Sequence, residues 1–491
     1  MPEEKALEPD VERPRSPVSP PYSAFSPWQK RWILFLSALS GMFSPMSSFI
    51  FYPAITALAS GIGVTVGLVN LAITTYMVVS GITPALLGNA ADELGRRPIY
   101  ILAFSIYFAA NVGLALQNSY PALLVLRMVQ SAGSSGTISL GYGIMSDIAS
   151  PSERGFYVGL FSLGPNVAPP LGPVLGGVIA ARLGWRWIFW FLVIFGGACL
   201  LLIILALPET ARSIVANGSI PATGIYRMPL VFLFEGGKEN IPHSTERKEV
   251  RKSIIPNPIA CLRLLAQKDI LIVLLCNGIY YATYCCVQAS LSTLFIEIYG
   301  YQELQAGLIY IPFGLGCLLS VYIWGKILDY DYIRTAKSYG VTVNRGHDVN
   351  IDIFPIEVAR LRSSVYLIVL SALGTISYGW VVQIQVHVSV VLVIQTIIGF
   401  AITGIFVALG TLLTDLNSNR SSTAAASANL IRCALAAGGL AALQPIIDAI
   451  GAGWCFTIFG LLTAACGPLL FLEMRLGHRW RKSRSLREAS S

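Results

Sequence analysis

Long apolar runs alternate with short polar segments along most of this chain. A run of about 20 residues with almost no charge is long enough to cross a bilayer as a helix, which satisfies its backbone hydrogen bonds internally. The runs predict an all-α polytopic membrane protein with twelve transmembrane helices in two six-helix halves. The first six are expected at residues 32–58, 67–87, 98–116, 121–146, 156–181 and 188–207. The second six are expected at residues 270–295, 304–324, 366–382, 388–413, 423–446 and 454–472.

The polar segments divide the chain into five regions. Residues 1–31 are polar and rich in proline, which predicts a disordered tail and argues against a cleavable signal peptide. The other four are a six-helix bundle at 32–207, a polar central loop at 208–269, a second bundle at 270–474 and a basic tail at 475–491.

The positions of the basic residues predict the orientation. Most of the 34 lysines and arginines lie in the two tails, the central loop and the other segments on one side of the predicted membrane. Because basic segments stay in the cytoplasm, both termini and the central loop are expected there. The plasma membrane is the default location, although a vacuolar membrane fits the same pattern.

Composition agrees with a membrane protein and excludes several other classes. Only 12% of the residues are charged, against about 25% in ordinary soluble domains. The net charge of +8 is spread over the segments between apolar runs, so no nucleic-acid partner is expected. The nine cysteines and four histidines form no metal-ligand spacing. No phosphate-binding loop is present, so we expect no ATP drive. The sequence contains no HExxH motif and no catalytic acid pair, so we expect no enzymatic activity, no metal and no cofactor.

The segment between the second and third predicted helices carries the most specific motif. It runs from Gly88 to Pro98 and resembles the GxxxDxxGRR loop of major facilitator proteins. Glycine permits a tight turn there, and an aspartate can pair with a nearby arginine or with a helix N-terminus. The resemblance implies a cytoplasmic gate that opens during transport, built from Gly88, Asp92, Gly95, Arg96 and Arg97.

A weak internal repeat extends this gate and supports two related halves. Asp147 followed by Arg154, ahead of the fifth helix, parallels Asp415 followed by Arg420, ahead of the eleventh. We therefore place Asp147 and Arg154 in the gate. Related halves are typical of alternating-access transporters.

The fifth predicted helix carries a second motif. Its GPxxGG core resembles the motif of exporters and antiporters in the same superfamily. Small residues recur every fourth position, which favours close helix packing, and packing alone is a sufficient explanation for them. The resemblance implies export. The motif residues are Pro169, Gly172, Pro173, Gly176 and Gly177.

Three helices present polar faces that are candidates for substrate binding. In the fourth helix, Arg127, Gln130 and Ser134 share one face. They resemble the RxxQG segment of the superfamily, although Ser131 stands where the glycine is expected. An arginine inside a membrane is functional by default, the alternative being a structural pairing with a carbonyl or carboxylate. The seventh and eleventh helices add Asn277, Tyr281, Gln288, Asn429 and Arg432. For the tyrosine, packing is a better explanation than substrate binding.

Further segments narrow the resemblance to fungal drug:proton antiporters with twelve helices. They are residues 207–210, 354–357, 429–433 and 444–445, so the similarity spans most of residues 30–475. That subfamily exports drugs, polyamines, organic acids such as citrate, and products of biosynthetic clusters. The resemblance implies a monomeric secondary transporter whose partners are a small-molecule substrate, the lipid bilayer and protons.

The charges inside the predicted helices favour an anionic cargo. The two deep charges are Arg127 and Arg432, whereas every acid lies at a helix end or outside the spans. Guanidinium groups suit carboxylates, so we expect export of an anionic or polar metabolite, an organic acid above all. The alternatives are a multidrug efflux pump for neutral lipophilic compounds and a nutrient importer of the same fold.

Overall fold

The computed structural model describes residues 22–149, 154–230, 267–339, 354–417 and 421–490. Every regular element within these ranges is a helix, which confirms the predicted all-α class. Nine helical runs in the described ranges are long and apolar enough to cross a membrane.

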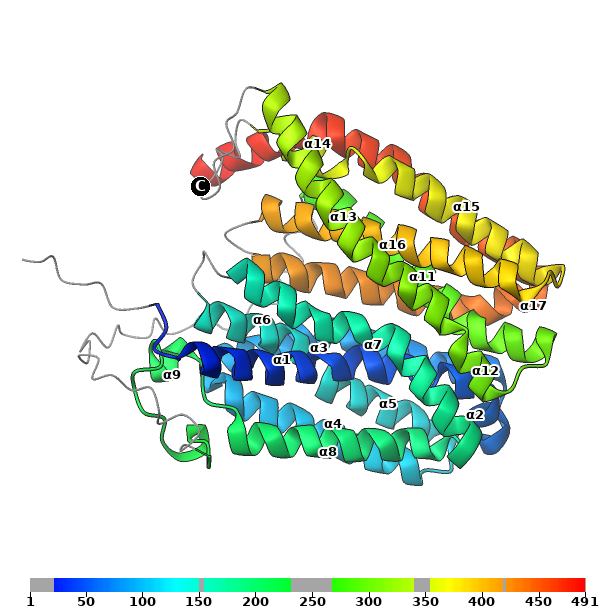
Figure 1. Cartoon of the computed structure of the whole chain (residues 1–491), viewed down its shortest axis with the longest axis horizontal. Coiled ribbons are helices and arrows are strands. Elements are labelled where there is room, and N and C mark those ends of the chain that lie inside the picture. The colour runs from blue at the N-terminus through cyan, green and yellow to red at the C-terminus, as the bar shows by residue number, and fades with distance from the viewer. Residues whose placement is uncertain (1–21, 150–153, 231–266, 340–353, 418–420, 491) are drawn as a thin grey trace, which may run out of the picture.

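The first half of the chain folds into one group of helices (Figure 1). A serine N-cap, Ser26, starts the first of them by accepting a hydrogen bond from the backbone of Gln29, whose side chain in turn accepts one from the cap. The elements are α1 Pro27–Phe49, η1 Tyr52–Ala54, α2 Ile55–Ile62, α3 Val66–Leu94, α4 Arg96–Leu116, α5 Tyr120–Ser134, α6 Gly136–Ile148, α7 Arg154–Leu183, α8 Arg186–Ala206, α9 Arg212–Val215 and η2 Gly224–Tyr226.

The second half forms another group beside the first. Its last helical run contains a kink at Gly451, where φ is 82° and ψ is 164°, so α17 is two helices joined end to end. The elements are α11 Lys268–Tyr299, α12 Glu303–Leu308, α13 Tyr310–Ser338, α14 Ile356–Leu361, α15 Ser364–Gln383, α16 Val388–Leu416 and α17 Ser421–Ser490.

Each of the twelve predicted spans is mostly helical, but their ends and continuity differ from the prediction. The first is interrupted between α1 and α2, the fourth is divided at Ser135, and the eighth is divided at Ile309. The eleventh and twelfth are both contained in α17, which counts as a single membrane-length run. The number of twelve crossings therefore stays a prediction.

The molecule has two distinct ends. At one, which we call the α9 end, lie α9, α14 and the last part of α17 (Figure 1, left). At the other, the η1 end, lie η1, α2 and α12 (Figure 1, right). The candidate gate residues lie at the α9 end.

The two halves meet along two seams. In the first, α3 packs on α17, where Asn429 donates a hydrogen bond to the Ser80 carbonyl at 2.9 Å. In the second, α7 packs on α12 and α13, so closely that a Cβ on Gly307 would lie 2.8 Å from the Pro173 carbonyl oxygen. At the η1 end the Ser292 hydroxyl donates to the Tyr52 carbonyl at 2.6 Å. Packing between the halves is therefore tight at the η1 end.

Candidate functional site

Arg127 of α5 lies deep in the first half, with only 1% of the residue exposed. The central carbon of its guanidinium lies over two rings, 4.2 Å from the centroid of Phe51 and 4.5 Å from that of Tyr76. Cation–π contact with both rings stabilises a charge that burial disfavours.

Hydrogen bonds hold one edge of this guanidinium and leave the other edge open. Nη1 donates to the Ser47 carbonyl at 2.9 Å and to Oε1 of Gln130 at 2.6 Å. Gln130 is oriented in turn because its amide donates to Asn111 at 2.7 Å. Nε and Nη2 of Arg127 find no hydrogen-bond partner among the described residues. Nor does Arg127 belong to any ion pair identified within those ranges.

Ser134, the third residue predicted on this face, joins the same network through a tyrosine. The Tyr76 hydroxyl lies 3.0 Å from Ser134 Oγ and 2.8 Å from the Ser44 carbonyl oxygen. The ring that covers Arg127 is therefore held in place by Ser134. This arrangement brings the three predicted residues of α5 into one site.

The second half contributes Arg432 of α17, which is less enclosed. Its guanidinium lies 5.2 Å from the Tyr281 ring centroid, and Nη2 donates to Asn429 at 3.3 Å. The Tyr281 ring stacks on Tyr284 at 6.1 Å, and Tyr284 in turn contacts Phe49 of the first half at 5.8 Å. An aromatic chain thus links the surroundings of Arg432 to the first half.

Two other predicted residues, Asn277 and Gln288, are buried on α11. No hydrogen bond identified among the described residues joins either side chain to Arg432. Gln288 instead lies beside Tyr310, whose hydroxyl donates to the Gln288 carbonyl at 2.6 Å. The structure therefore brings Asn429 and Tyr281 into contact with Arg432. Asn277 and Gln288 take no part in these contacts.

Several residues of this site were absent from the predicted set, among them Phe51, Tyr52 and Tyr76. Tyr52 is fully buried, and its hydroxyl has no hydrogen-bond partner within the described ranges. Phe51 and Tyr52 stand at the break between α1 and α2, just before Pro53. An aromatic pair before a proline inside an apolar run is a signal that could have drawn attention to them.

The motif of the fifth predicted helix lies in α7 and faces two partners. A Cβ on Gly176 would overlap the backbone oxygen of Ile50, so this glycine permits close contact between α7 and the end of α1. Gly172 lies on the same face, where a Cβ would be 3.2 Å from the Ile50 nitrogen. On the other face, Pro173 and Gly177 contact Gly307 of the second half. Pro169, also in α7, is half-buried.

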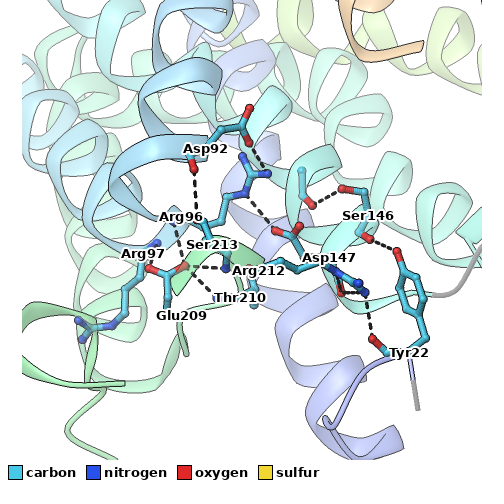
Figure 2. Close-up of polar contacts among 12 residues, drawn as sticks. Tyr22, Asp92, Arg96, Arg97, Ser146, Asp147, Glu209, Thr210, Arg212 and Ser213 are labelled. Carbon is cyan, nitrogen blue, oxygen red and sulfur yellow. Dashed lines mark hydrogen bonds and ion pairs between the residues drawn. The ribbon is translucent and has the colours of Figure 1, made fainter. Parts of the chain in front are cut away.

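At the α9 end, Arg96 begins α4 and pairs with two acids (Figure 2). Its Nε donates to Oδ2 of Asp147 at 3.1 Å, and its Nη2 lies 2.6 Å from Oδ1 of Asp92. The Asp147 side chain is 11% exposed, whereas that of Asp92 is 61% exposed. Burial raises the pKa of Asp147 to about 6, although the charge of Arg96 opposes this shift.

Glu209, which follows α8, organises the start of α4 (Figure 2). Its carboxylate accepts hydrogen bonds from the backbone N–H groups of Arg96 at 2.9 Å and Arg97 at 3.2 Å. It also accepts from the backbone of Thr210 and Ala211, each at 2.9 Å. A carboxylate at a helix N-terminus satisfies free N–H groups and the helix dipole together. This organising role was not predicted.

The glycines of the gate loop and Arg97 support this arrangement. Gly95 has φ of +95°, and a Cβ there would lie 2.6 Å from the Glu209 carboxylate, so only glycine fits. Gly88 has ordinary contacts, since a Cβ there would lie 3.6 Å from Ser139 Oγ. Arg97 donates from Nε to the Leu207 carbonyl at 2.9 Å. Arg97 therefore ties the segment after α8 to α4, and no ion pair identified among the described residues joins it to a gate acid.

The end of the N-terminal tail contacts the same cluster (Figure 2). The Tyr22 hydroxyl donates to the Ser146 carbonyl at 2.9 Å, and the Arg212 guanidinium lies 3.8 Å from the Tyr22 ring centroid. Arg212 also donates to the Asp147 carbonyl at 2.9 Å. Arg154, a predicted gate residue, is the first residue of α7, but its side chain lies outside the described part.

The second half repeats the arginine–aspartate pair at the same end. Arg360 of α14 donates from Nε to Oδ2 of Asp415 at 2.9 Å. Asp415 is the last residue but one of α16, as Asp147 is of α6, which agrees with the predicted repeat. Arg420, the counterpart of Arg154 in the second half, lies outside the described residues.

Known proteins resemble the chain over nearly its whole length. The pattern of the Major Facilitator Superfamily matches residues 37–442. The MFS-type transporter phiD of Fungal sp. (strain ATCC 74256) is 38% identical over 95% of this chain and 71% of its own length. Citrate exporter 1 of Aspergillus niger is 36% identical over 98% of this chain and 92% of its own length.

Two solved structures share the fold at low sequence identity. A D-xylose–proton symporter gives a TM-score of 0.65 at 15% identity, covering 89% of this chain and 96% of that one. The human organic anion transporter MFSD10 gives a TM-score of 0.55 at 20% identity, covering 90% of this chain and 99% of that one. Both agree with an integral, multi-pass membrane architecture. The chain therefore belongs to the Major Facilitator Superfamily of transporters.

Proposed function

We propose that this transporter exports a small organic anion, with a carboxylate as the recognised group. The observation that carries the proposal is the open edge of Arg127, whose Nε and Nη2 have no partner within the described residues. A buried guanidinium with unsatisfied donors costs several kcal/mol unless a ligand completes it. Two adjacent N–H groups of one guanidinium match the two oxygens of a carboxylate.

The position of Arg432 supports an anion rather than a cation. It supplies a second positive charge, from the other half, and its Nε also lacks a hydrogen-bond partner among the described residues. A cationic cargo would meet like charges in both halves. A cargo with two or more carboxylates could contact both arginines, and the similarity to a citrate exporter points in the same direction.

Alternating access would expose this site to one side at a time. Contacts between the halves at the η1 end include the Ser292–Tyr52 hydrogen bond. In the described part of the α9 end, Arg96 pairs with acids of the first half, and Arg360 pairs with an acid of the second. We infer a conformation closed at the η1 end, with the α9 end on the cytoplasmic side.

The relatives and the α7 motif support export as the direction of transport. The fungal relatives include a named exporter, and the α7 motif resembles that of exporters and antiporters. We therefore propose proton-coupled export across the plasma membrane by a monomer, with both termini in the cytoplasm. In this account residues 32–207 and 270–474 are the two moving bundles, and residues 208–269 form the cytoplasmic loop between them.

An efflux pump for neutral lipophilic compounds is the second candidate. The rings of Phe49, Tyr52, Tyr281 and Tyr284 near the arginines favour it, because aromatic surfaces bind many apolar compounds. A nutrient importer of the same fold is a third candidate, which the α7 motif disfavours.

Counterflow in sealed proteoliposomes would distinguish these functions. Vesicles containing the purified full-length protein are loaded with an unlabelled tricarboxylate, dicarboxylate, neutral lipophilic compound or organic cation, and uptake of the labelled compound is followed. We expect exchange of carboxylates, accelerated by a proton gradient directed against the export flux. Exchange of only the neutral or cationic compounds would contradict the proposal.

A further inference from the structure

A groove of about 640 Å³ lies between α15 and the part of α17 that follows Gly451. We call it the α15–α17 groove. Every described residue that lines it is apolar, and small residues such as Ala372, Ala464 and Gly467 make the hollow. Phe471 also lines it and is 49% exposed. Because α15 lies at the edge of the second half away from the first, the groove is on the outside of the molecule (Figure 1).

The groove lies on the part of the molecule that meets the hydrocarbon of the bilayer. α15 is long and apolar enough to cross a membrane, as is the run that contains the end of α17. A lipid acyl chain lying in the groove contacts protein on several sides and gains dispersion energy that a flat helix surface does not provide. Acyl chains of all phospholipids share this property. Selection of one class of lipid therefore requires a contact with the headgroup.

Two exposed arginines continue the helix surfaces that line the groove, both toward the α9 end. Arg362 stands three residues before Val365, and the backbone between them stays helical. Arg475 follows Phe471 by four residues, and its guanidinium lies 4.5 Å from the Phe471 ring centroid. No ion pair or hydrogen bond of either guanidinium is identified among the described residues. Both charges are therefore available to a ligand.

The packing of the two helices brings these arginines to neighbouring positions. A Cβ on Gly467 would lie 3.5 Å from the Ile368 side chain, and a Cβ on Gly477 would lie 2.9 Å from Glu357 Cγ. Arg475 lies between the two glycines in the sequence, and Arg362 lies between their two partners. The pair of positive charges therefore stands at one end of the apolar groove.

The first half shows how the corresponding place is filled by the chain itself. There α4 packs on α8, which are the third and sixth predicted helices as α15 and the end of α17 are the ninth and twelfth. Arg97, at the start of α4, donates hydrogen bonds to the carbonyls of Leu207 and Ile225 in the segment that follows α8. In the second half α17 continues as a helix past Arg475, so the described chain does not turn back to contact the two arginines.

We propose that the α15–α17 groove binds one anionic phospholipid, with an acyl chain in the groove and the headgroup phosphate at Arg362 and Arg475. Guanidinium groups match the oxygens of a phosphate. Basic sites between membrane helices bind anionic headgroups, which are concentrated in the cytoplasmic leaflet. The choice of leaflet rests on the proposed function, which places the α9 end in the cytoplasm.

The bound lipid would act beside the arginine–aspartate pair of the second half. Arg360, two residues before Arg362, pairs with Asp415 of α16. A headgroup that contacts both Arg362 and Arg475 joins the end of α14 to α17 next to this pair. The site therefore makes the packing of the second half at the α9 end depend on anionic lipid.

Native mass spectrometry of the delipidated full-length protein in a mild detergent tests the site. The protein is titrated with phosphatidylserine, with phosphatidylcholine, and with glycerophosphoserine, which is the soluble headgroup without acyl chains. We expect one phosphatidylserine to bind about ten- to thirtyfold more tightly than phosphatidylcholine, because two arginines contribute to the headgroup contact. Glycerophosphoserine should bind more weakly than either phospholipid. Equal affinity for the two phospholipids, or equal affinity for glycerophosphoserine and phosphatidylserine, would overturn the proposal.

Two variants separate the headgroup contact from the groove. Arg362→Gln combined with Arg475→Gln should lose the preference for phosphatidylserine and keep the affinity for phosphatidylcholine. Ala464→Phe fills the groove and should weaken the binding of both phospholipids. The matched control combines Arg334→Gln with Lys337→Gln, two exposed basic residues near the end of α13, and should keep the wild-type preference.

Three results with these variants would contradict the proposal. One is a preference that survives in the Arg362 and Arg475 variant, and another is a preference lost equally in the control. The third is self-association of the delipidated protein that Ala464→Phe abolishes, because it would make a second copy of the chain the occupant of the groove. No cargo takes part in these measurements, so the lipid site can fail while carboxylate exchange stands, and the reverse.

Discussion

The two halves follow one plan, yet they differ in how completely their charges are satisfied. Arg127 in the first half is enclosed by two rings and tied by two hydrogen bonds along one edge. Within the described ranges, Arg432 in the second half has one ring nearby and one hydrogen bond at 3.3 Å. At the α9 end of the first half, the Glu209 carboxylate accepts four hydrogen bonds from backbone N–H groups.

This difference indicates a division of roles. Moving a group that is held by several contacts costs free energy. The first half therefore provides a preorganised binding site for cargo. Arg432 is held by fewer contacts among the described residues, so the second half is the more adjustable part. The predictions below test this division, from the largest expected effect to the smallest.

Removing the enclosed arginine should reduce transport most. Truncating a buried, hydrogen-bonded charge that binds cargo costs several kcal/mol, so Arg127→Ala should lower carboxylate exchange by about a hundredfold or more. Arg432→Ala should lower it by about tenfold, because this side chain is less enclosed and less tightly held. Initial rates in proteoliposomes at matched protein content measure both. Unchanged organic-acid transport in both variants would remove the basis for an anionic cargo.

Crowding the α7 glycine should impair folding. In Gly176→Ala the new Cβ overlaps the Ile50 backbone oxygen, and overpacking of this kind costs about 1–3 kcal/mol or more. The matched control is Gly438→Ala in α17, the repeat counterpart of α7, where a Cβ would meet no atom within 4 Å. Yield of monodisperse protein and the unfolding midpoint should fall for Gly176→Ala only. Equal losses in both variants would show that the α1–α7 contact is not the cause.

Replacing Glu209 by its amide should destabilise the protein. Glu209→Gln places an NH₂ group against backbone N–H donors, so it should lower the free energy of unfolding by about 1–3 kcal/mol near neutral pH. The matched control is Glu93→Gln, which changes an exposed acid at the same end and should keep the wild-type stability. Unfolding midpoints of the two variants measure the effect. Destabilisation of similar size in both variants would contradict the organising role of Glu209.

Asp92→Asn should have the smallest effect on stability. Its carboxylate is largely exposed, and an exposed ion pair contributes about 0–1 kcal/mol, so expression should stay close to wild type. Transport should nevertheless fall by several fold, because the proposed gate closes through this charge. Near-normal flux at normal expression would count against the gating role.

Features set within one helix were predictable from the sequence, and contacts between helices were not. Apolar runs predicted the all-α class, and helical spacing placed Arg127, Gln130 and Ser134 on one face, where the structure connects them. The small-residue stripe of α7 was visible, but nothing in its spacing identified Ile50 as its partner. Such partners depend on how distant segments pack.

The same limit applies to Glu209. Its role depends on a helix that begins 113 residues earlier in the chain. The superfamily resemblance is confirmed by the relatives, whereas the assignments of binding and gating residues stay predictions.

The most direct test of the central claim is binding of a carboxylate to the purified protein, followed by the ligand-dependent rise in unfolding midpoint. Wild type should be stabilised by the tricarboxylate or dicarboxylate that it exchanges. Arg127→Lys keeps the charge but loses the two parallel N–H donors of the guanidinium, so it should lose most of this stabilisation. Arg432→Lys should retain part of it. Equal stabilisation of wild type and Arg127→Lys would contradict the assignment of Arg127 as the carboxylate anchor.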